Sequence, residues 1–402
     1  MVQARQGTPA FQENVNLVRD HESSLGWESR FSLVRANDTS LKIQAQTYHG
    51  PQDPRIKTEL ALNVPCNGVS TTPDGRLFAV FARVDGSTGP QVVEVYRENN
   101  TFQAYPNAEW NTFEEGDDPK RHYIGVNGQR IGPDGNLWVI DKGAPALGAP
   151  VIFPGGPKLV VVDTTTDKVK RVYDMSNATR SNSLLDDVRF SAGMGKAYLT
   201  DAGSPGLIVL DLDSGQIVRL LDDDPSTKIG LPVSAEGTLL KLGDEPAYIY
   251  ADQLEVSPNG KWFYFQSASG GMNRIETQWL DNAFYNASLN SNAVLGGFVQ
   301  PYAHTPSTGG TAIDAEGNIY NSDTDSQRII KISPNGTMTT LVQDPRLLWV
   351  DAMWIDGNNK LWMPAAQLNR GTPFNNGESR IVKPLYVYSI DIGVGPSPID
   401  HD

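Results

Sequence analysis

The sequence predicts an all-β chain that folds as a six-bladed β-propeller with four-stranded blades. Three observations predict it: a hairpin that recurs six times, further strands behind the hairpins, and 38 Gly and 27 Pro spread along all 402 residues. Glycine and proline at this density indicate many short strands joined by turns. Regular recurrence of one such unit is typical of repeat folds, in which each unit packs on its neighbours.

The recurring unit is a hairpin built on the turn Pro-Asp-Gly or a near relative. Its flanks are rich in β-branched and aromatic residues, and a Gly or Asn supplies the positive φ that the turn needs. The six segments are residues 69–81, 129–141, 188–201, 254–266, 312–323 and 353–364. Their turn residues are Gly75, Gly135, Gly195, Gly260, Gly317 and Asn359. Repeats this long argue against the alternative architecture, an open β-solenoid.

Outer strands are expected behind the hairpins, at residues 90–97, 157–173, 205–221, 327–342 and 380–392. The C-terminal sequence supplies only about three strands for the last blade. We expect residues 41–50, LKIQAQTYHG, to supply its missing outer strand and so close the ring without an open edge. The domain prediction is therefore an N-terminal arm over 1–40, a propeller over 41–392 and a C-terminal tail over 393–402.

Charge and cysteine content narrow the partners. The formal net charge of −14 disfavours nucleic acid and anionic membranes, and no apolar run has the length of a membrane span. Cys66 is the only cysteine, so neither an internal disulfide nor a cysteine-based metal site is expected. We expect a secreted protein whose signal peptide has been removed, with no obligate protein partner. Five glycosylation sequons favour this location: Asn37, Asn99, Asn177, Asn286 and Asn335.

A ring of polar residues is expected where the channel opens opposite the turns. Eight positions before the turn residues stand Asn67, Asn127, Asp187, Asp252, Gly309 and Asp351. Strand interiors disfavour Asn and Asp, so these residues either cap strand starts by bonding local backbone or form a polar ligand or ion site. Carboxylates that converge on one channel need a cation, bound protons or a polar ligand.

The loops at the same face are expected to complete a small-molecule pocket, because they bring aromatic and polar side chains together. Segments before the inner strands carry His122, Tyr123, Asn182, Tyr248, Tyr250, His304, Arg346 and Trp349. Loops after the second strands carry Arg83, Asp141, Lys142, Asp201, Ser204, Gln266, Met272, Asp323, Asp325, Gln367 and Arg370. The candidate catalytic residues are Tyr123, Asp187, Asp252, Tyr250 and His304. The candidate ligand-binding residues are Asn67, Asn127, His122, Trp349, Asp351, Arg83 and Met272.

Two segments, 157–171 and 184–215, resemble the Yellow/major royal jelly protein family, above all in the run TDAGSPGLIVLDL. The resemblance extends more weakly from about Leu62 to Ile392. It implies a six-bladed propeller that is usually secreted, and the single cysteine favours a fungal or bacterial-type branch over the insect members, which often carry disulfides. Members differ in activity: some bind small aromatic amines, and some are linked to pigment chemistry. Similar fungal propellers act in natural-product pathways, including pericyclases that join a quinone methide to an alkene by hetero-Diels–Alder addition.

A second resemblance is to calcium-dependent lactonases of the gluconolactonase/regucalcin type, whose inner strands begin with N-G-x-x-x-[SG]-P-D-G. It implies that Asn127 and Asp187 would hold the metal if calcium were bound, with Asn67 and Asp252 as further matches. The same family needs a Glu near the first inner strand, and this chain has Asn67 there.

Three functions remain open. The first is a cyclase of fungal secondary metabolism that needs no cofactor, because cycloaddition needs oriented partners and hydrogen-bond donors to a carbonyl oxygen. In it Tyr123, Tyr250, His304 and Trp349 would form walls and donors, and Asp187 or Asp252 would assist loss of water. The second is a non-catalytic binder of an aromatic amine or phenol. The third is the calcium lactonase, in which the metal polarises an ester carbonyl.

Overall fold

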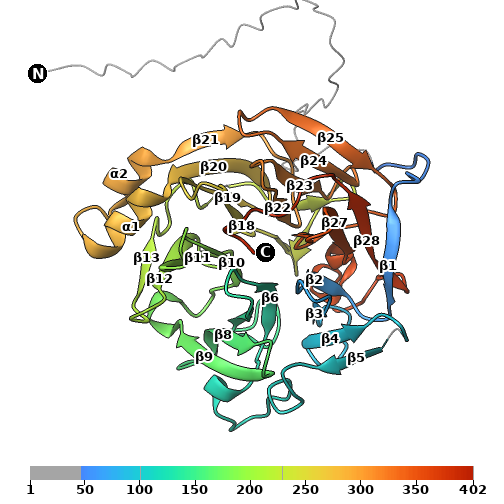
Figure 1. Cartoon of the computed structure of the whole chain (residues 1–402), viewed down its shortest axis with the longest axis horizontal. Coiled ribbons are helices and arrows are strands. Elements are labelled where there is room, and N and C mark those ends of the chain that lie inside the picture. Colours follow the sequence, from blue (N-terminus) through green and yellow to red (C-terminus); the bar gives the residue numbers. More distant parts are fainter. Residues whose placement is uncertain (1–46, 100, 229, 402) are drawn as a thin grey trace, which may run out of the picture.

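The hairpins form the inner strands of six four-stranded antiparallel sheets arranged around one axis (Figure 1). The structure is a computed structural model, and it describes residues 47–99, 101–228 and 230–401. It confirms the predicted all-β, six-bladed propeller with four-stranded blades. The ring closes on itself, which an open solenoid would not do.

The first three blades follow one another directly along the chain. Blade one consists of β2 (Cys66–Thr71), β3 (Leu77–Phe81), β4 (Val92–Tyr96) and β5 (Thr101–Ala104). Blade two consists of β6 (Val126–Ile131), β7 (Leu137–Lys142), β8 (Pro157–Asp163) and β9 (Lys168–Asp174). Blade three consists of β10 (Leu185–Phe190), β11 (Lys196–Asp201), β12 (Gly206–Asp211) and β13 (Ile217–Leu220).

The other three blades complete the ring. Blade four consists of β18 (Ala251–Val256), β19 (Trp262–Ser267), β20 (Gly270–Glu276) and β21 (Gln300–Ala303). Blade five consists of β22 (Thr311–Ile313), β23 (Ile319–Asp323), β24 (Arg328–Ile332) and β25 (Met338–Gln343). Blade six consists of β26 (Trp354–Ile355), β27 (Lys360–Ala365), β28 (Leu385–Asp391) and β1 (Lys57–Leu62).

An N-terminal strand closes the ring, as predicted, but it is β1 and not the segment 41–50. β1 pairs antiparallel with β28, from Lys57 opposite Ser389 to Leu62 opposite Leu385. Residues 47–50 carry no strand, and 41–46 lie outside the described residues. The apolar residues of β1 explain the choice, because Leu60 and Leu62 are buried against the neighbouring strands.

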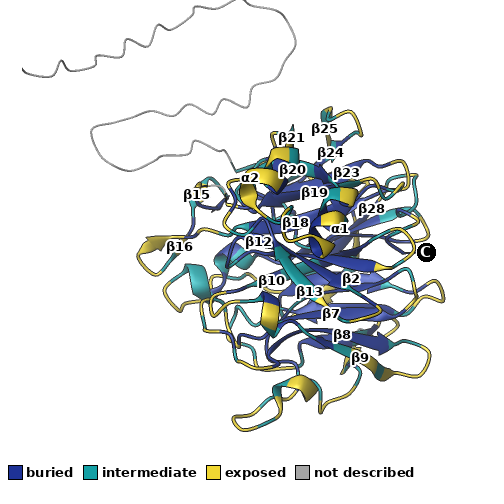
Figure 2. Ribbon diagram, turned by 90° about the vertical axis from the view of Figure 1, so that its left-hand side faces the viewer, coloured by how far each residue is buried: buried dark blue, intermediate teal, exposed yellow. Residues whose placement is uncertain are grey.

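The turns follow the predicted chemistry in five of the six hairpins. Positive φ occurs at Gly75, Gly135, Gly260, Gly317 and Asn359. Blade three differs, because Gly193 and Met194 take positive φ there and the predicted Gly195 does not. The strands between these turns are almost wholly buried, as the dark ribbons of Figure 2 show, so the core lies between adjacent blades.

Additional elements decorate the ring. α1 (Thr277–Tyr285) and α2 (Asn292–Leu295) lie outside blades three and four (Figure 1). Two small hairpins, β14 (Ser234–Ala235) with β15 (Thr238–Leu239) and β16 (Lys241–Leu242) with β17 (Glu245–Pro246), project from one face. The 3₁₀ turns are η1 (Pro119–Arg121), η2 (Ser176–Ala178), η3 (Gly296–Phe298), η4 (Leu368–Arg370) and η5 (Thr372–Phe374). None of the described helices has the length and apolar character that a membrane span requires.

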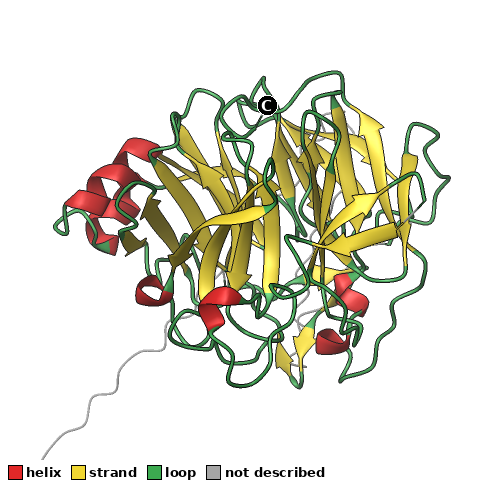
Figure 3. Cartoon of the chain, turned by 60° about the horizontal axis from the view of Figure 1, so that its bottom comes forward, coloured by secondary structure: helices red, strands yellow, loops and turns green. Residues whose placement is uncertain are grey.

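The C-terminal tail enters the central channel from the face opposite the small hairpins (Figures 1 and 3). The ring of His401 stacks on Trp354 at 3.5 Å between centroids, and His401 Nε2 lies 2.7 Å from the carbonyl oxygen of Ile355. Asp400 accepts a hydrogen bond of 2.6 Å from Arg130 Nη2. The tail therefore plugs one end of the channel and leaves the other end as its mouth.

Candidate functional site

The open end of the channel holds a pocket with about 1000 Å³ of empty space, counted out to its mouth. Its walls are largely apolar and come from loops of several blades. The apolar lining includes Val84, Leu147, Ile249, Trp349, Leu368 and Phe374. Its floor is polar and is formed by Asn67, Asn127, Asp186, Asp252 and Asp351. This combination fits a small organic ligand that presents oxygen atoms to the floor.

A repeated backbone irregularity produces the floor. The inner strands of blades one to four lose their register near their first residues, as at Cys66/Gly68 in β2 and Val126/Gly128 in β6. A β-bulge takes the extra residue out of the ladder and re-aims its side chain. Asn67 and Asn127 are such residues, and both line the pocket.

Blade three places Asp186 at the pocket, where the sequence predicted Asp187. The turn residue of this hairpin is Met194, whose amide donates to the carbonyl oxygen of Ser191 as that of Gly260 donates to Ser257, so counting eight positions back from Gly195 ends one residue too late, whereas counting from Met194 gives Asp186. Asp187 also lines the deeper part of the channel, and its carboxylate accepts a hydrogen bond of 3.1 Å from Arg130 Nη1 and pairs with Arg189. Its charge is therefore neutralised by arginine.

Burial favours the protonated form of the carboxyl groups in the floor. Burial raises the pKa of Asp351 to about 8, and the nearby charge of Asp186 adds to this rise. Burial together with the adjacent Asp186 holds the pKa of Asp252 well above its usual range. Burial also raises the pKa of Asp186 to about 6, although its hydrogen bonds to Asp252 and Asn127 oppose the rise. At neutral pH the floor therefore contains carboxylic acids as well as carboxylate.

Hydrogen bonds hold the floor groups in place. Asn127 Nδ2 donates to Asp186 Oδ1 at 2.5 Å, and Asn67 Nδ2 donates to the carbonyl oxygen of Asn127 at 3.0 Å. Trp349 Nε1 donates to Asp351 Oδ2 at 2.8 Å, so this tryptophan serves both wall and floor. Asn67 Oδ1 is buried and has no hydrogen-bond partner among the described residues, so it is free to accept from a ligand.

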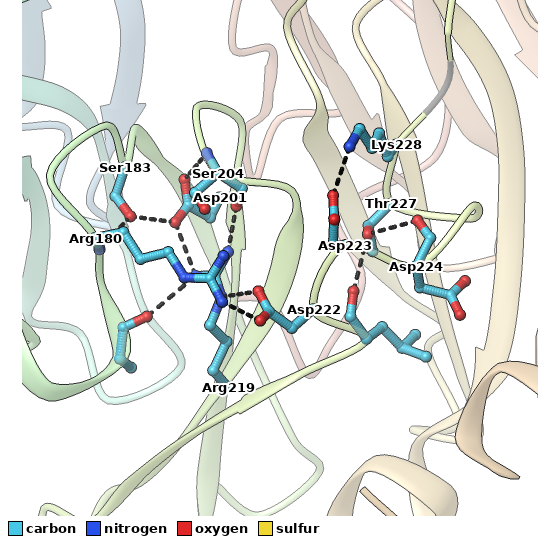
Figure 4. A network of polar contacts seen from close by, with 12 residues as sticks. Arg180, Ser183, Asp201, Ser204, Arg219, Asp222, Asp223, Asp224, Thr227 and Lys228 are labelled. Atoms are coloured by element: carbon cyan, nitrogen blue, oxygen red, sulfur yellow. Dashed lines mark hydrogen bonds and ion pairs between the residues drawn. The ribbon is translucent and has the colours of Figure 1, made fainter. Parts of the chain in front are cut away.

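Buried carboxylates anchor the loops around the mouth. Asp201, at the end of β11, accepts hydrogen bonds from the amides of Leu184 and Ser204, both 2.9 Å, and from Arg219 Nη1 at 2.8 Å. Arg219 also pairs with Asp222, and Figure 4 shows this network. Blade two has the same arrangement at Asp141. The Asp141 carboxylate accepts hydrogen bonds from the amides of Ile124 and Gly125 and from Lys158 Nζ at 2.6 Å. The mouth is therefore built on rigid supports.

Several predicted site residues lie away from the pocket. Tyr123 is fully buried and packs on Trp110 with 5.2 Å between ring centroids, and Met272 is buried in the core of blades four and five. His122 Nδ1 lies 2.6 Å from the carbonyl oxygen of Thr112. His304 is exposed, and Tyr250 stacks on Tyr248 outside the lining. The pocket instead gathers Asn67, Asn127, Asp252, Trp349, Asp351 and Arg83 of the predicted set.

Sequence reasoning missed the apolar wall and Asp186. Leu147, Ile249, Leu368 and Phe374 come from long loops whose course no periodic pattern predicts. A signal for Asp186 was present, because Asp186 and Asp187 stand together where the other blades have one Asx residue.

The pair Asn127 and Asp187 does not fit a calcium ion. The Asp187 carboxylate is engaged by two arginines, and the Asn127 amide is turned to Asp186. In the described part of the chain, no group of three or more His, Cys, Asp or Glu side chains has an arrangement suited to a metal ion. Position 67, where the lactonase pattern has Glu, carries Asn67.

Comparison with known proteins places the chain among propellers. The profile of the family described as major royal jelly protein matches residues 125–380. A gluconolactonase of Zymomonas mobilis is 30% identical over 152 residues, which make up 36% of this chain and only 38% of that protein.

Solved structures resemble the chain in fold. A luciferin-regenerating enzyme superposes with a TM-score of 0.53 at 14% identity, over 86% of this chain and 99% of its own. The regucalcin of Agrobacterium tumefaciens, described as a calcium-binding protein, gives 0.50 at 12% identity, over 88% and 97%. At these identities the likeness establishes a common propeller architecture.

Proposed function

The chain belongs to the major royal jelly protein family, and we propose that its channel mouth binds an oxygenated aromatic molecule with an alkene and catalyses their cycloaddition. The observation that carries the proposal is the pocket itself, an apolar-walled chamber over a floor of carboxyl groups that keep their protons. Apolar walls exclude water and orient two apolar partners, which raises the rate of a bimolecular reaction without a nucleophile.

The heterodiene of such a reaction is a quinone methide, which forms when a hydroxybenzyl alcohol loses water. Asp252 is placed to protonate the departing hydroxyl group, because burial and the adjacent Asp186 raise its pKa well above the usual range and it lies in the floor. The phenolic proton leaves to solvent at the mouth, and Asp252 regains its proton from solvent. The adjacent Asp186 keeps that proton on Asp252 until transfer.

The floor also offers a donor for the carbonyl oxygen of the quinone methide. The pKa of Asp351, about 8, leaves its carboxyl group mainly protonated at neutral pH, and a neutral acid donates a hydrogen bond where a carboxylate would repel. The alkene then adds across the heterodiene, with one carbon–carbon and one carbon–oxygen bond formed. The walls decide which face reacts.

The test is the stereochemistry of the product. A hydroxybenzyl alcohol and a terpenoid alkene are incubated with the protein, and the adduct is resolved by chiral chromatography. We expect one stereoisomer to predominate and to form faster than in the blank reaction. Asp252→Asn should lower the rate at least about 10²-fold. A racemic adduct formed at the blank rate contradicts the proposal.

The second candidate is a lactonase, which the partial match to a gluconolactonase favours. It predicts hydrolysis of a sugar lactone, and because Asn127 and Asp187 do not fit a calcium ion, hydrolysis that stops with EDTA and returns with calcium would require a metal site at other residues. Cycloaddition that is insensitive to EDTA, with no lactone hydrolysis, decides for the first candidate.

We also propose that the protein is secreted, or works within the secretory pathway, and that it takes part in fungal secondary metabolism. Four of the five sequons support this location because they lie in exposed positions, at Asn99, Asn177, Asn286 and Asn335, while Asn37 lies outside the described residues. Glycosidase treatment of protein from a secreting host, followed by mass spectrometry, checks it.

A further inference from the structure

Two cationic side chains line one wall of the pocket without a carboxylate partner. Lys142 ends β7 and Arg83 follows β3, and both contribute to the lining. Lys142 Nζ lies beside Gly125, where a Cβ would come within 2.9 Å of it. Among the described residues, no hydrogen bond or ion pair is formed by the Lys142 ammonium group. Arg83 donates only to the carbonyl oxygen of Gly89, at 2.7 Å from Nη2.

The nearest carboxylate is already engaged. Asp141 precedes Lys142 on β7, but successive side chains of a strand point to opposite faces. Its Oδ2 accepts from Lys158 Nζ at 2.6 Å, and its Oδ1 accepts from the amide of Gly125. Burial lowers the pKa of Lys142 to about 8, and the positive charge of Arg83 lowers it further while Asp141 opposes the change. Below that pH the wall still carries two positive charges.

A positive charge without a counter-anion on an apolar wall is costly, and an anionic ligand atom offsets this cost. The chain as a whole is acidic, with a net charge of −14, so this local excess of positive charge stands out against its surroundings. The floor holds the carboxylate of Asp186 beside the protonated Asp351, and this negative charge would repel a ligand with several negative charges such as a phosphate. The wall therefore suits a single anionic oxygen on an otherwise apolar molecule.

We propose that Lys142 and Arg83 form an anion subsite that selects ligands with an ionised phenolic or enolic oxygen. The inference deepens the proposed function and rests on it in taking the channel mouth as the ligand site. It gives Lys142 a positioning role in the reaction. The phenolate oxygen bound by Lys142 becomes the carbonyl oxygen of the quinone methide, to which the protonated Asp351 of the floor is the donor proposed above once the hydroxyl group has left.

The experiment measures ligand binding without turnover. The probe is 4-nitrophenol, whose visible absorbance reports ionisation, titrated with the full chain at a pH below that at which the free phenol ionises. We expect the phenolate band to grow on binding, and 4-nitroanisole, the methyl ether, to bind at least about tenfold more weakly. Lys142→Met should lose about tenfold in affinity and the ionisation, while Lys142→Arg should retain both. Lys170→Met, at an exposed position of β9, is the matched control and should bind like the unchanged protein.

Equal binding by Lys142→Met and the unchanged protein overturns the subsite, as does a bound probe that stays neutral or a probe that fails to bind. Thermal unfolding of each variant shows whether it is folded. A protein that binds nitrophenolate through Lys142 and yet yields racemic adduct contradicts the proposed reaction alone. If the protein yields one stereoisomer but Lys142→Met binds the probe as tightly as the unchanged protein, the result contradicts the subsite alone.

Discussion

Asp186, Asp252 and Asp351 lie together at the bottom of an apolar pocket, where water cannot screen their mutual repulsion. Protons solve this problem at neutral pH, because burial favours the uncharged form of each carboxyl group. The hydrogen bond between Asp252 and Asp186 leaves Asp252 as the acid and Asp186 as the partner that titrates first. Buried carboxyl groups that would destabilise a closed core can therefore donate protons to a ligand in this pocket.

This proton uptake makes stability depend on pH in a direction that can be tested. A carboxyl group whose pKa is higher in the folded protein stabilises it below the unfolded value, near pH 4, and this contribution is lost as the pH rises through the folded value, which is about 8 for Asp351 and well above the usual range for Asp252. Asp252→Asn removes one such group. Between pH 5 and pH 7 the free energy of unfolding of this variant should fall less steeply than that of the unchanged protein. The two slopes should differ by up to about 1.4 kcal/mol per pH unit. Urea unfolding at both pH values measures it.

The control for this prediction is Asp213→Asn, at an exposed position. Its pH dependence should equal that of the unchanged protein. Parallel slopes for Asp252→Asn and the unchanged protein would show that Asp252 is ionised in the folded state.

At the scale of the element, the loops at the mouth depend on buried ion pairs behind them. Arg219 of β13 connects Asp201, which is fully buried, to Asp222 (Figure 4). Arg219→Met leaves the Asp201 charge without its partner and should lower the free energy of unfolding by about 3–5 kcal/mol. Arg180→Met removes the other arginine that pairs with Asp222, but the side chain of Arg180 is 49% exposed. Its loss should cost under about 1 kcal/mol. Urea unfolding of the two variants measures both losses of stability. Equal losses would contradict the supporting role assigned to Arg219.

The elements also show what the sequence could and could not predict. Turn chemistry and alternating apolar residues are local, so five of the six turn residues and the hairpins themselves were predictable. The place of the closing strand was not, because it depends on long-range packing: the prediction named residues 41–50, but β1 pairs with β28 and buries Leu60 and Leu62. Asp186 was missed because the turn residue of blade three is Met194 and not Gly195, which shifts the count by one residue. Tyr123 was misplaced because the loop before β6 turns its side chain into the core, and Met272 because it lies within β20, where its side chain packs in the core, and not in a loop.

At the scale of the whole molecule, the channel is open at one end only. Below the acidic floor lies a layer of charge in which Arg189 pairs with Glu255 at 2.8 Å and Arg130 with Asp400 at 2.6 Å. Beneath it His401 stacks on Trp354. The pocket is therefore blind, which retains bound molecules and keeps bulk water on one side.

The plug should contribute measurably to stability. Asp400→Asn keeps the shape of the side chain and removes its charge, so Arg130 retains only Asp187, at 3.1 Å, as an anionic partner. We expect a loss of about 2–3 kcal/mol in the free energy of unfolding at neutral pH. Differential scanning calorimetry measures it. Asp391→Asn, exposed at the end of β28, serves as the control and should change little. An unchanged midpoint for Asp400→Asn would mean that the tail does not bind the channel.

Under the proposed function, the pocket at the channel mouth determines the stereochemistry of the cycloaddition. Ala146 lies exposed at the rim of this pocket, so Ala146→Trp fills the mouth without touching the core. Ala287→Trp places the same side chain on an exposed loop behind α1. The measurement is the enantiomeric excess of the adduct formed by each variant. We expect one stereoisomer from Ala287→Trp and from the unchanged protein, and a racemate formed at the blank rate from Ala146→Trp. Equal excess from both variants would place the reaction elsewhere, and a racemate from the unchanged protein would contradict the function.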